Sequence, residues 1–207
     1  MYATIAFKIA QIILIAYLLG SIPTGYLIVK KLKGIDIRTT GSGSTGATNV
    51  KRILGTKWFF TVMILDALKG ALAVLIALKY YNFIVLEQLY GLTPVLAAIF
   101  VILGHSKSVF LKFTGGKSVA TGVGTILALC WPVGLIIAAI WGTVTYISKY
   151  VSLGSVVAIA TAPLLMTAFD QSTYYIWFAA LGAIYVIFMH KENIKRLIQG
   201  TESKVRK

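Results

Sequence analysis

Seven long apolar runs dominate this chain and limit the folds that it can adopt. They occupy residues 5–29, 58–78, 93–103, 118–129, 133–148, 153–169 and 173–189. A helix needs about 20 residues to cross roughly 30 Å of hydrocarbon, and five of the runs reach or approach that length. The third and fourth runs are shorter. An extension back through residues 83–90 would lengthen the third, and the fourth is predicted to be a half-helix, which membranes tolerate where it lines a cavity.

The composition also favours a membrane protein over a soluble domain. Only 13% of the 207 residues are charged, whereas ordinary soluble domains carry about 25%. A closed transmembrane barrel would show alternating strands of about ten residues, and these runs do not alternate. We therefore expect an all-α polytopic membrane protein: a seven-helix bundle with short or half-helices near the functional site, forming one domain over residues 1–207.

The basic residues predict how the chain is oriented. The formal net charge of +14 would indicate nucleic-acid binding in a soluble protein, but here the basic residues lie at the ends of the apolar runs. Seventeen of the 20 Lys and Arg fall in segments 30–57, 104–117, 149–152 and 190–207, which seven crossings place on one side. That side is expected to be cytoplasmic. The prediction is a multi-pass protein with its N-terminus outside, its C-terminus inside and no nucleic-acid partner.

Three short polar stretches end apolar runs on this predicted cytoplasmic side. They read GSGSTGATN at 41–49, FTGGKS at 113–118 and HKEN at 190–193. Glycine exposes backbone N–H groups, and lysine and arginine neutralise anions, so such stretches suit phosphate. The chain has one cysteine, Cys130, within an apolar segment, and it is interpreted as a packing residue. Neither a metal nor a cofactor is expected.

The first stretch combines hydroxyls, glycines and a cation. Ser42 lies among three glycines, where hydroxyls and backbone amides can converge on an anion. Asn49 and Arg52 are three residues apart, so they share one face of a helix that begins near Thr48. The alternative is a polar linker between two spans, which would not require this order of residues.

The second stretch resembles a Walker A loop at its end only. That motif requires a glycine where Leu111 stands, so we do not predict nucleotide hydrolysis. Ser118 is expected to open an apolar helix, with Gly115 and Gly116 just outside its anion-attracting N-terminus.

Several other polar residues lie inside or at the ends of the runs. His190 and Asn193 share a helical face, and spacing alone leaves open whether the histidine is functional or merely interfacial. Asp66 and Lys69 lie inside the second run and are interpreted as a structural ion pair rather than as substrate ligands. For the remaining polar candidates we favour structural roles. His105 is interpreted as a structural residue, and Ser152 and Ser155 as helix caps.

Taken together and in order, these motifs resemble those of the acyl-phosphate:glycerol-3-phosphate acyltransferase family (PlsY). The matching segments are GSIP at 20–23, GSG at 41–43, GATN at 46–49, DALKG at 66–70, GH at 104–105, FLKF at 110–113, GGK at 115–117, SLGS at 152–155, HKENI at 190–194 and GTE at 200–202. The resemblance covers essentially the whole chain. It implies a seven-helix enzyme of the bacterial plasma (inner) membrane that transfers a fatty acyl group from long-chain acyl phosphate to the 1-hydroxyl of sn-glycerol 3-phosphate. The products are lysophosphatidate and phosphate, in the first step of phospholipid synthesis.

The resemblance also implies residue roles. The catalytic residues are Ser42, Arg52, His190 and Asn193. The substrate-binding residues are Thr48, Asn49, Lys112, Gly115, Gly116, Lys117, Ser152 and Ser155. Glu202 is structural, and the enzyme is expected to act as a monomer surrounded by membrane lipid.

The sequence departs from the family pattern in three places. Ser44 stands where the family usually has Asn, Ser118 where it has Gly, and Lys107-Ser108 where it has Phe-Pro. The added side chain of Ser118 is expected to narrow the phosphate loop and to affect substrate affinity more than reaction type.

An acyl phosphate already carries a good leaving group, so direct transfer without a covalent acyl-enzyme is predicted. Arg52 and Lys112 would neutralise phosphate, and either His190 or a substrate phosphate oxygen would take the hydroxyl proton. The His-x4-Asp motif of other glycerol-phosphate acyltransferases is absent, since neither His105 nor His190 is followed by an aspartate at that spacing. The alternative function is a transporter or flippase for an organophosphate or anionic lipid, which predicts a site near the bilayer midplane.

Overall fold

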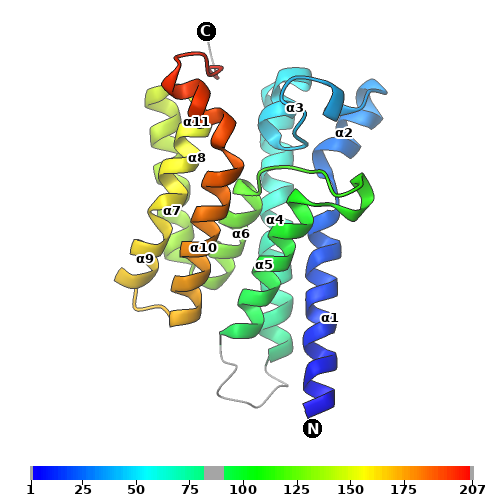
Figure 1. Cartoon of the computed structure of the whole chain (residues 1–207), viewed down its shortest axis with the longest axis vertical. Coiled ribbons are helices and arrows are strands. Elements are labelled where there is room, and N and C mark those ends of the chain that lie inside the picture. Colours follow the sequence, from blue (N-terminus) through cyan, green and yellow to red (C-terminus); the bar gives the residue numbers. More distant parts are fainter. Residues whose placement is uncertain (1, 82–90, 206–207) are drawn as a thin grey trace. The chain divides into compact units, whose positions relative to one another are not determined.

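The computed structural model describes residues 2–81 and 91–205, and the chain divides into two compact units, Met1–Ala128 (unit 1) and Leu129–Lys207 (unit 2) (Figure 1). Unit 1 contains α1 (Tyr2–Ser21), α2 (Thr24–Lys33), the 3-10 turn η1 (Ile37–Thr39), α3 (Ala47–Leu54), α4 (Thr56–Tyr81), α5 (Leu92–Ser106), the 3-10 turn η3 (Val109–Leu111) and α6 (Val119–Leu129). The last residue of α6, Leu129, is the first residue of unit 2. Unit 2 contains α7 (Trp131–Ser148), α8 (Val151–Ala160), α9 (Ala162–Ala168), α10 (Thr173–Met189) and α11 (Lys191–Ile198). Within the described ranges there is no strand, only an isolated bridge between Ser108 and Thr114, so the all-α prediction is confirmed.

Several helices are long and apolar enough to cross a membrane. In the described part of the chain four spans meet this test by length and composition: Ile5–Lys33, Thr56–Tyr80, Trp131–Ser148 and Val151–Ala168. A fifth is added if α10 and α11, which are bent by 60° at their junction, count as one. The chain is therefore a multi-pass membrane protein, while the number of seven crossings stays a prediction.

The two short runs remain short in the structure. α5 has 15 residues and α6 has 11. At 1.5 Å per residue α6 is about 17 Å long, roughly half the thickness of the hydrocarbon core. This length agrees with the half-helix predicted for residues 118–129. The proposed extension through residues 83–90 lies outside the described residues.

Small residues bring the helices of unit 1 into close contact. A side chain at Gly20 would collide with a backbone carbonyl of α5, and one at Gly104 would collide with a carbonyl of α1. In the same way Gly70 and Gly124 let α4 and α6 approach each other. Small residues allow such close backbone approach between membrane helices. The end of α5 is thereby held beside α1, which places the segment that follows it.

Two apolar clusters fill unit 1. The first joins α1, α4 and α5 through Ile12, Ala16, Ala73, Ala77, Ala97 and Val101. The second, formed by Val29, Ile37, Val50 and Val62, joins α2, η1, α3 and α4. Because Ile37 and Val50 flank the first glycine-rich stretch on both sides, this second cluster fixes the ends of that loop.

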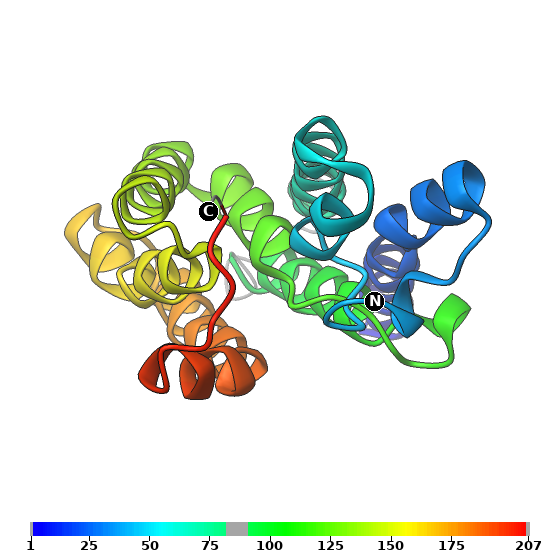
Figure 2. The ribbon, with the colours of Figure 1, turned by 90° about the horizontal axis from the view of Figure 1, so that it is seen from above.

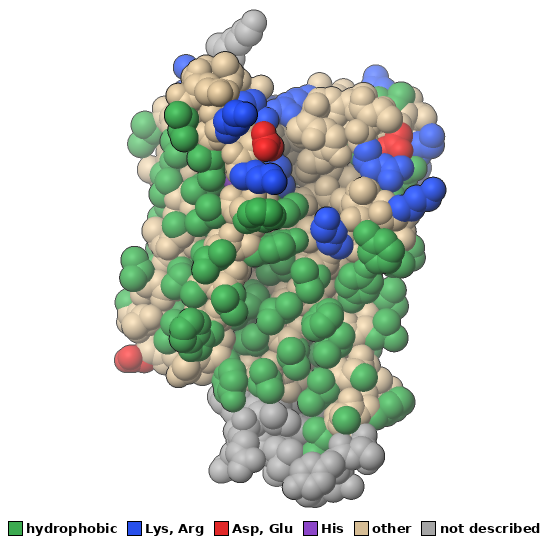
Figure 3. All heavy atoms as spheres, viewed as in Figure 1, with side chains coloured by type: hydrophobic (Ala, Val, Ile, Leu, Met, Phe, Trp, Pro, Cys, Tyr) green, Lys and Arg blue, Asp and Glu red, His purple; other side chains and the backbone are tan. Residues whose placement is uncertain are grey.

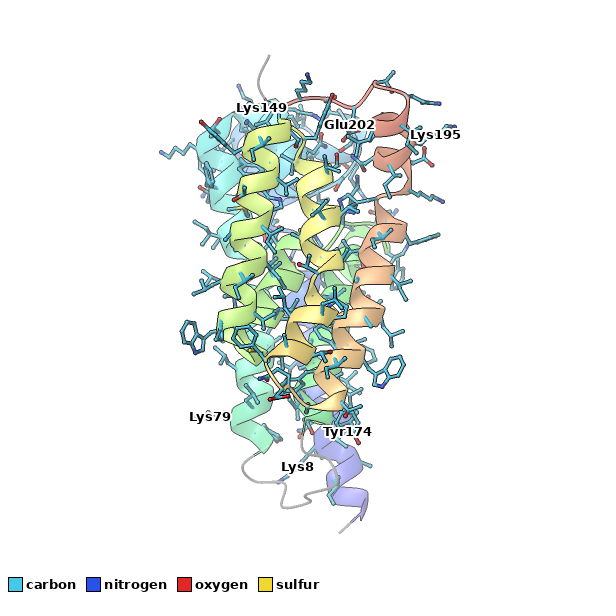
Figure 4. The ribbon with its side chains drawn as sticks, turned by 90° about the vertical axis from the view of Figure 1, so that its left-hand side faces the viewer. Lys8, Lys79, Lys149, Tyr174, Lys195 and Glu202 are labelled. Carbon is cyan, nitrogen blue, oxygen red and sulfur yellow. The ribbon has the colours of Figure 1, made fainter. Side chains whose placement is uncertain are left out.

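Most basic residues of each unit lie toward one end, whereas Lys8 and Lys79 of unit 1 lie toward the other end (Figure 4). On the face shown in Figure 3, hydrophobic side chains cover most of each unit, and Lys and Arg gather at one end of it. Within unit 2, Lys149, Lys195 and Glu202 lie at one end and Tyr174 at the other (Figure 4). The segment after α11 runs back over that end toward α7 and α8 (Figure 2), where the Val205 N–H donates a 2.8 Å hydrogen bond to the Lys149 carbonyl.

Candidate functional site

Asn49 organises the first glycine-rich loop from inside. It lies in the first turn of α3 and is only 1% exposed. Its Nδ2 donates to the carbonyl oxygens of Ile37 (3.3 Å), Thr40 (3.0 Å) and Ser44 (2.9 Å), and its Oδ1 accepts a 3.1 Å bond from the Ser42 N–H. Both ends of this amide are therefore bound to the backbone of the loop, which they hold in one conformation.

The first loop leaves a cation and a hydroxyl at the surface. Gly41 has a φ of 58°, and a side chain there would collide with Asn49 Oδ1 and lie 3.5 Å from Arg52 Cδ. Asn49 and Arg52 thus face the same glycine, as their spacing predicts. Ser42, Thr48 and Arg52 are exposed. In the part of the chain that the structure describes, no carboxylate forms an ion pair with Arg52. An exposed, uncompensated guanidinium beside a glycine-rich turn is suited to an anion.

The second loop, residues 107–118, has a strained backbone. Lys112 and Phe113 both adopt left-handed conformations, with φ of 55° and 59°. Each such residue costs about 1–2 kcal/mol, so the surroundings must impose the conformation. The Ser108 carbonyl accepts a 2.8 Å bond from the Phe113 N–H, which closes the turn. Lys112 projects from this turn and is exposed.

The second loop is also tied to α1. The Tyr17 hydroxyl donates to the Lys107 carbonyl at 2.7 Å, and the Ser108 hydroxyl donates to the Ser21 carbonyl at 2.6 Å. Ser108 is 1% exposed. The start of the loop is therefore fixed to the last turn of α1.

Arg38 joins the first loop to the second. Its Nη1 donates to the Leu111 carbonyl at 3.3 Å and to Thr114 Oγ1 at 3.4 Å. The same guanidinium pairs with Asp36 at 2.6 Å, and this hydrogen bond lowers the pKa of the Asp36 carboxyl from its usual value. The first two predicted stretches thus lie together in unit 1. Arg38 was not predicted as a site residue, although its position two residues after an aspartate and three before Gly41 was a signal.

The second loop ends at the cap of α6. The Gly116 N–H donates to the His105 carbonyl at 3.1 Å, and Lys117 is half-buried. α6 begins at Val119, and Ser118 precedes it with a φ of 62°. The Ser118 hydroxyl donates to the Ile102 carbonyl at 3.0 Å, so its side chain is directed to α5.

A buried polar network lies in unit 1 near the second loop. The predicted ion pair between Lys69 Nζ and Asp66 Oδ1 forms, at 2.9 Å. The same Oδ1 accepts a 3.0 Å bond from the Thr24 hydroxyl and lies 3.6 Å from His105 Nδ1. Lys69 also donates to the Ile22 carbonyl at 2.8 Å. The network therefore connects α4 to the end of α5 and to the break between α1 and α2.

In unit 2, His190 lies at the bend between α10 and α11. It is 4% exposed, and its Nδ1 is 2.8 Å from the Val186 carbonyl oxygen. A carbonyl oxygen only accepts hydrogen bonds, so in the neutral ring Nδ1 carries the proton and Nε2 is the basic nitrogen. The bend thus fixes both the position and the tautomer of the histidine.

Glu202 accepts hydrogen bonds from three other side chains of unit 2. Its Oε1 accepts from Asn193 Nδ2 at 2.6 Å and from the Ser152 hydroxyl at 2.8 Å, and its Oε2 accepts from Arg196 Nε at 2.7 Å. Burial raises the pKa of the Glu202 carboxyl, but these three hydrogen bonds outweigh that effect and lower it. Asn193 and Ser152, predicted from the resemblance as catalytic and substrate-binding residues, are thus joined through one carboxylate.

The predicted site residues therefore fall into two groups, one in each unit. Unit 1 holds Ser42, Thr48, Asn49, Arg52, Lys112, Gly115, Gly116 and Lys117, and unit 2 holds Ser152, Ser155, His190 and Asn193. Ser155 is 3% exposed and its hydroxyl donates to the Val151 carbonyl at 2.8 Å.

Comparisons with known proteins agree on one family. Residues 10–200 match the family model described as glycerol-3-phosphate acyltransferase. Glycerol-3-phosphate acyltransferases from Trichormus variabilis and Nostoc sp. are 48% and 49% identical to the chain over 204 and 206 residues, covering 94% of this chain and 90% of each relative. The corresponding protein of Thermoanaerobacter sp. is 47% identical over 193 residues, covering 93% of both chains.

Two solved structures are also similar over nearly the whole chain. They are crystal structures of PlsY, an integral membrane glycerol 3-phosphate acyltransferase, in a glycerol 3-phosphate form and a lysophosphatidic acid form. Their TM-scores are 0.86 and 0.84, with 37% and 36% sequence identity. The similarity covers 95% of this chain and 94% of each of those chains.

Proposed function

The chain belongs to the glycerol-3-phosphate acyltransferase family, and on this premise we propose that it transfers a fatty acyl group from long-chain acyl phosphate to the 1-hydroxyl of sn-glycerol 3-phosphate. The products are lysophosphatidate and inorganic phosphate, and no cofactor takes part. The similar PlsY structures are described in glycerol 3-phosphate and lysophosphatidic acid forms, which correspond to the acceptor and product of this reaction. The observation that carries the proposal is the pair of basic, glycine-rich loops joined by Arg38 in unit 1.

Both substrates are phosphate esters or anhydrides, so the enzyme has to hold two anions against their mutual repulsion. Arg52, in α3 just after the first loop, and Lys112, on the second loop, are exposed cations. Charge-assisted hydrogen bonds to phosphate are roughly twice as strong as neutral ones. Arg52, Lys112 and Lys117 bind the phosphates, and Ser42 and Thr48 add hydroxyl groups beside them. Gly115 and Gly116 let the second loop approach the phosphate closely, and the Gly116 N–H, bonded to the His105 carbonyl, holds the loop in place.

The reaction proceeds as a direct transfer. The acceptor hydroxyl oxygen attacks the acyl carbonyl carbon, the bond from that carbon to the phosphate oxygen breaks, and phosphate leaves with the electron pair. No acyl-enzyme is required, because phosphate is already a good leaving group, and Cys130 is buried. Holding the hydroxyl beside the carbonyl supplies much of the rate.

The hydroxyl proton passes either to His190 Nε2 or to a phosphate oxygen of the substrate. The Val186 carbonyl holds Nδ1–H, so Nε2 is the nitrogen able to accept a proton. Comparing pH–rate profiles of the parent and His190→Ala separates the two routes. Loss of the limb that reports histidine deprotonation, with a large fall in kcat, supports His190 as the base. An unchanged limb with a modest fall leaves His190 only an orienting role.

The proposal includes a location for this chemistry. The N-terminus lies outside the bacterial plasma membrane, the C-terminus and all three polar stretches lie in the cytoplasm, and the enzyme acts as a monomer. Single-cysteine variants at the exposed positions Arg52, Lys112 and Lys191, in a Cys130→Ala background, are to be labelled with an impermeant thiol reagent in intact cells and in inverted vesicles. All three should react from the cytoplasmic side only, and labelling on different sides would reject this topology.

The direct test of function uses the purified full chain in lipid bicelles. Palmitoyl phosphate and glycerol 3-phosphate should yield phosphate and lysophosphatidate in equal amounts. Omission of glycerol 3-phosphate and replacement of palmitoyl phosphate by palmitoyl-CoA are the controls, and both should abolish product. Absence of turnover in several lipids, together with exchange of glycerol 3-phosphate across proteoliposomes, would instead support the transporter.

A further inference from the structure

We propose that His105, held by Asp66, is a positioning residue for this reaction: its imidazole supports the backbone of the second loop at Gly116. The inference rests on the proposed function, because it assigns the supported backbone to binding of the acceptor phosphate. The sequence by itself favoured a purely structural reading of His105, and neither residue belongs to the predicted site.

The ring of His105 lies between Asp66 and the second loop. Its side chain is 7% exposed, and its Nδ1 is 3.6 Å from Asp66 Oδ1. On the other side, a Cβ built on Gly116 would collide with Nε2 and would lie 2.9 Å from Cε1 and 3.0 Å from Cδ2. Gly116 therefore packs directly on the edge of the ring. Its N–H also donates to the His105 carbonyl, so one residue contacts Gly116 with both its backbone and its side chain.

Asp66 is itself rigidly held. Lys69 and Thr24 both contact the same carboxylate oxygen that faces His105. A carboxylate inside a membrane span costs about 2.5–3.5 kcal/mol on the insertion scale, and an apolar cluster would fill the same space at lower cost. The Asp66 oxygen lies beside Nδ1, on the side of the ring away from Gly116, and limits how the imidazole can turn. The network thus sets the edge that the imidazole presents to Gly116.

The second loop needs such support because its backbone is strained. Lys112, Phe113 and Ser118 all have left-handed conformations. A side chain at Gly115 would collide with the His105 carbonyl and lie 2.9 Å from the Ser106 carbonyl carbon. Residues 115 and 116 are therefore glycine because the loop lies directly on the end of α5. Without the edge of the His105 ring beside Gly116, the backbone of the second loop would turn, and its amide groups would point in other directions.

A double-mutant cycle tests whether a methyl at residue 116 acts on the ring or on the substrate. Gly116→Ala is expected to raise the KM for glycerol 3-phosphate about tenfold or more with a smaller change in kcat, and His105→Ala to raise it severalfold. In the His105→Ala background, Gly116→Ala should then add less than about a twofold increase, because contacting residues are energetically coupled. The same Gly116→Ala factor in both backgrounds would show that the methyl meets the ligand, and would overturn the inference.

Further variants separate positioning from general destabilisation. His105→Gln keeps a polar atom near the place of Nε2 and should restore KM toward the parent, and Asp66→Asn should raise KM while kcat falls less. Gly122→Ala is the matched control, since the nearest atom to its Cβ is Ile102 Cδ1 at 3.9 Å, and its KM should not change. Thermal unfolding in detergent is recorded for every variant. If His105→Ala does not fold, the cycle is run with His105→Asn, whose shorter amide reaches the place of Nδ1 but leaves no atom at the place of Nε2. A full Gly116→Ala effect in that background would likewise overturn the inference.

The activity of the parent enzyme shows whether the proposed function or only the positioning role of His105 has failed. A parent that does not turn over palmitoyl phosphate and glycerol 3-phosphate rejects the proposed function. An active parent whose His105 and Gly116 variants behave independently rejects the positioning role alone.

Discussion

The two units use buried polar side chains for opposite purposes. In unit 1, Asn49 and His105 face the backbones of the loops and shape them, while Arg52 and Lys112 are left exposed on those loops. In unit 2, the side chains of Ser152, Asn193 and Arg196 all contact a single carboxylate, Glu202. The polar side chains of unit 1 thus shape loops beside exposed positive charge, and Glu202 joins α8, α11 and the C-terminal segment of unit 2. On the proposed function, this difference predicts that Arg52 acts on substrate directly and that Glu202 acts through the residues that it holds.

The strongest way to break this comparison is to remove the exposed charge of unit 1. Arg52→Ala is expected to lower kcat/KM by about 10²–10³-fold, as loss of one preorganised donor to a developing charge does. Its thermal unfolding midpoint should not change, because the side chain is exposed. Lys57→Ala, another exposed cation near α3, is the control and should keep near-parental kinetics. Retention of more than a tenth of the activity by Arg52→Ala would contradict the assignment.

The corresponding change in unit 2 should act on stability first. Glu202→Ala leaves Asn193 and Ser152 without their buried acceptor, and each unsatisfied polar group costs about 1–3 kcal/mol. We expect the midpoint of thermal unfolding to fall by several degrees, about 2–4 °C per kcal/mol for a chain of this size. Activity should fall only as far as His190 and Asn193 shift. Glu192→Ala, which removes an exposed carboxylate of α11, is the control and should leave the midpoint unchanged.

A pH series sharpens the same point. The pKa of Glu202 is lowered from its ordinary value of 4.5, so its charged form is favoured by folding. Its contribution is fully present above that value and is lost as the pH falls through the lower pKa of the folded state. The unfolding midpoint of the parent should therefore exceed that of Glu202→Gln at pH 7, and the gap should shrink below pH 4.5. A gap that is constant from pH 7 to pH 3 would show that the charge does not matter.

The smallest effect is expected at the departure from the family pattern. Ser118→Gly removes a left-handed side chain that costs about 1 kcal/mol and also removes a hydrogen bond of about 1 kcal/mol, so stability should hardly change. The KM for glycerol 3-phosphate should stay within about twofold, because the hydroxyl faces α5. Ser118→Ala keeps the strain without the bond and should be the less stable variant. A severalfold lower KM in Ser118→Gly would revive the idea that this side chain narrows the loop.

The sequence predicted the helices well where length and apolarity decide them. The run at 173–189 coincides with α10. The run at 5–29 was read as one helix, but the structure breaks it between Ser21 and Thr24. Pro23 signalled a possible break. The hydrogen bond from Lys69 to the Ile22 carbonyl, which stabilises the break, depends on packing that a linear pattern does not contain.

The site was predicted less completely, because its side chains meet partners far away in the sequence. Asn49 was identified as a site residue, yet spacing does not tell whether an amide faces a ligand or the carbonyls of its own loop. Ser152 and Glu202 are 50 residues apart, and the bond between them follows from the return of the C-terminal segment over unit 2. His105 was predicted to be only a structural residue, because its contact with Gly116 forms only once the second loop is folded.

α1 also holds the start of the second loop. The Tyr17 hydroxyl donates a hydrogen bond to the Lys107 carbonyl, and the Ser21 carbonyl accepts one from the Ser108 hydroxyl. α1 is more than an anchor that can be exchanged for any other apolar helix of the same length. These hydrogen bonds attach the segment around Lys107 and Ser108 to the end of α1. A chimera carrying a foreign first helix would still insert into the bilayer, but its second loop would lose the two hydrogen bonds that attach it to α1.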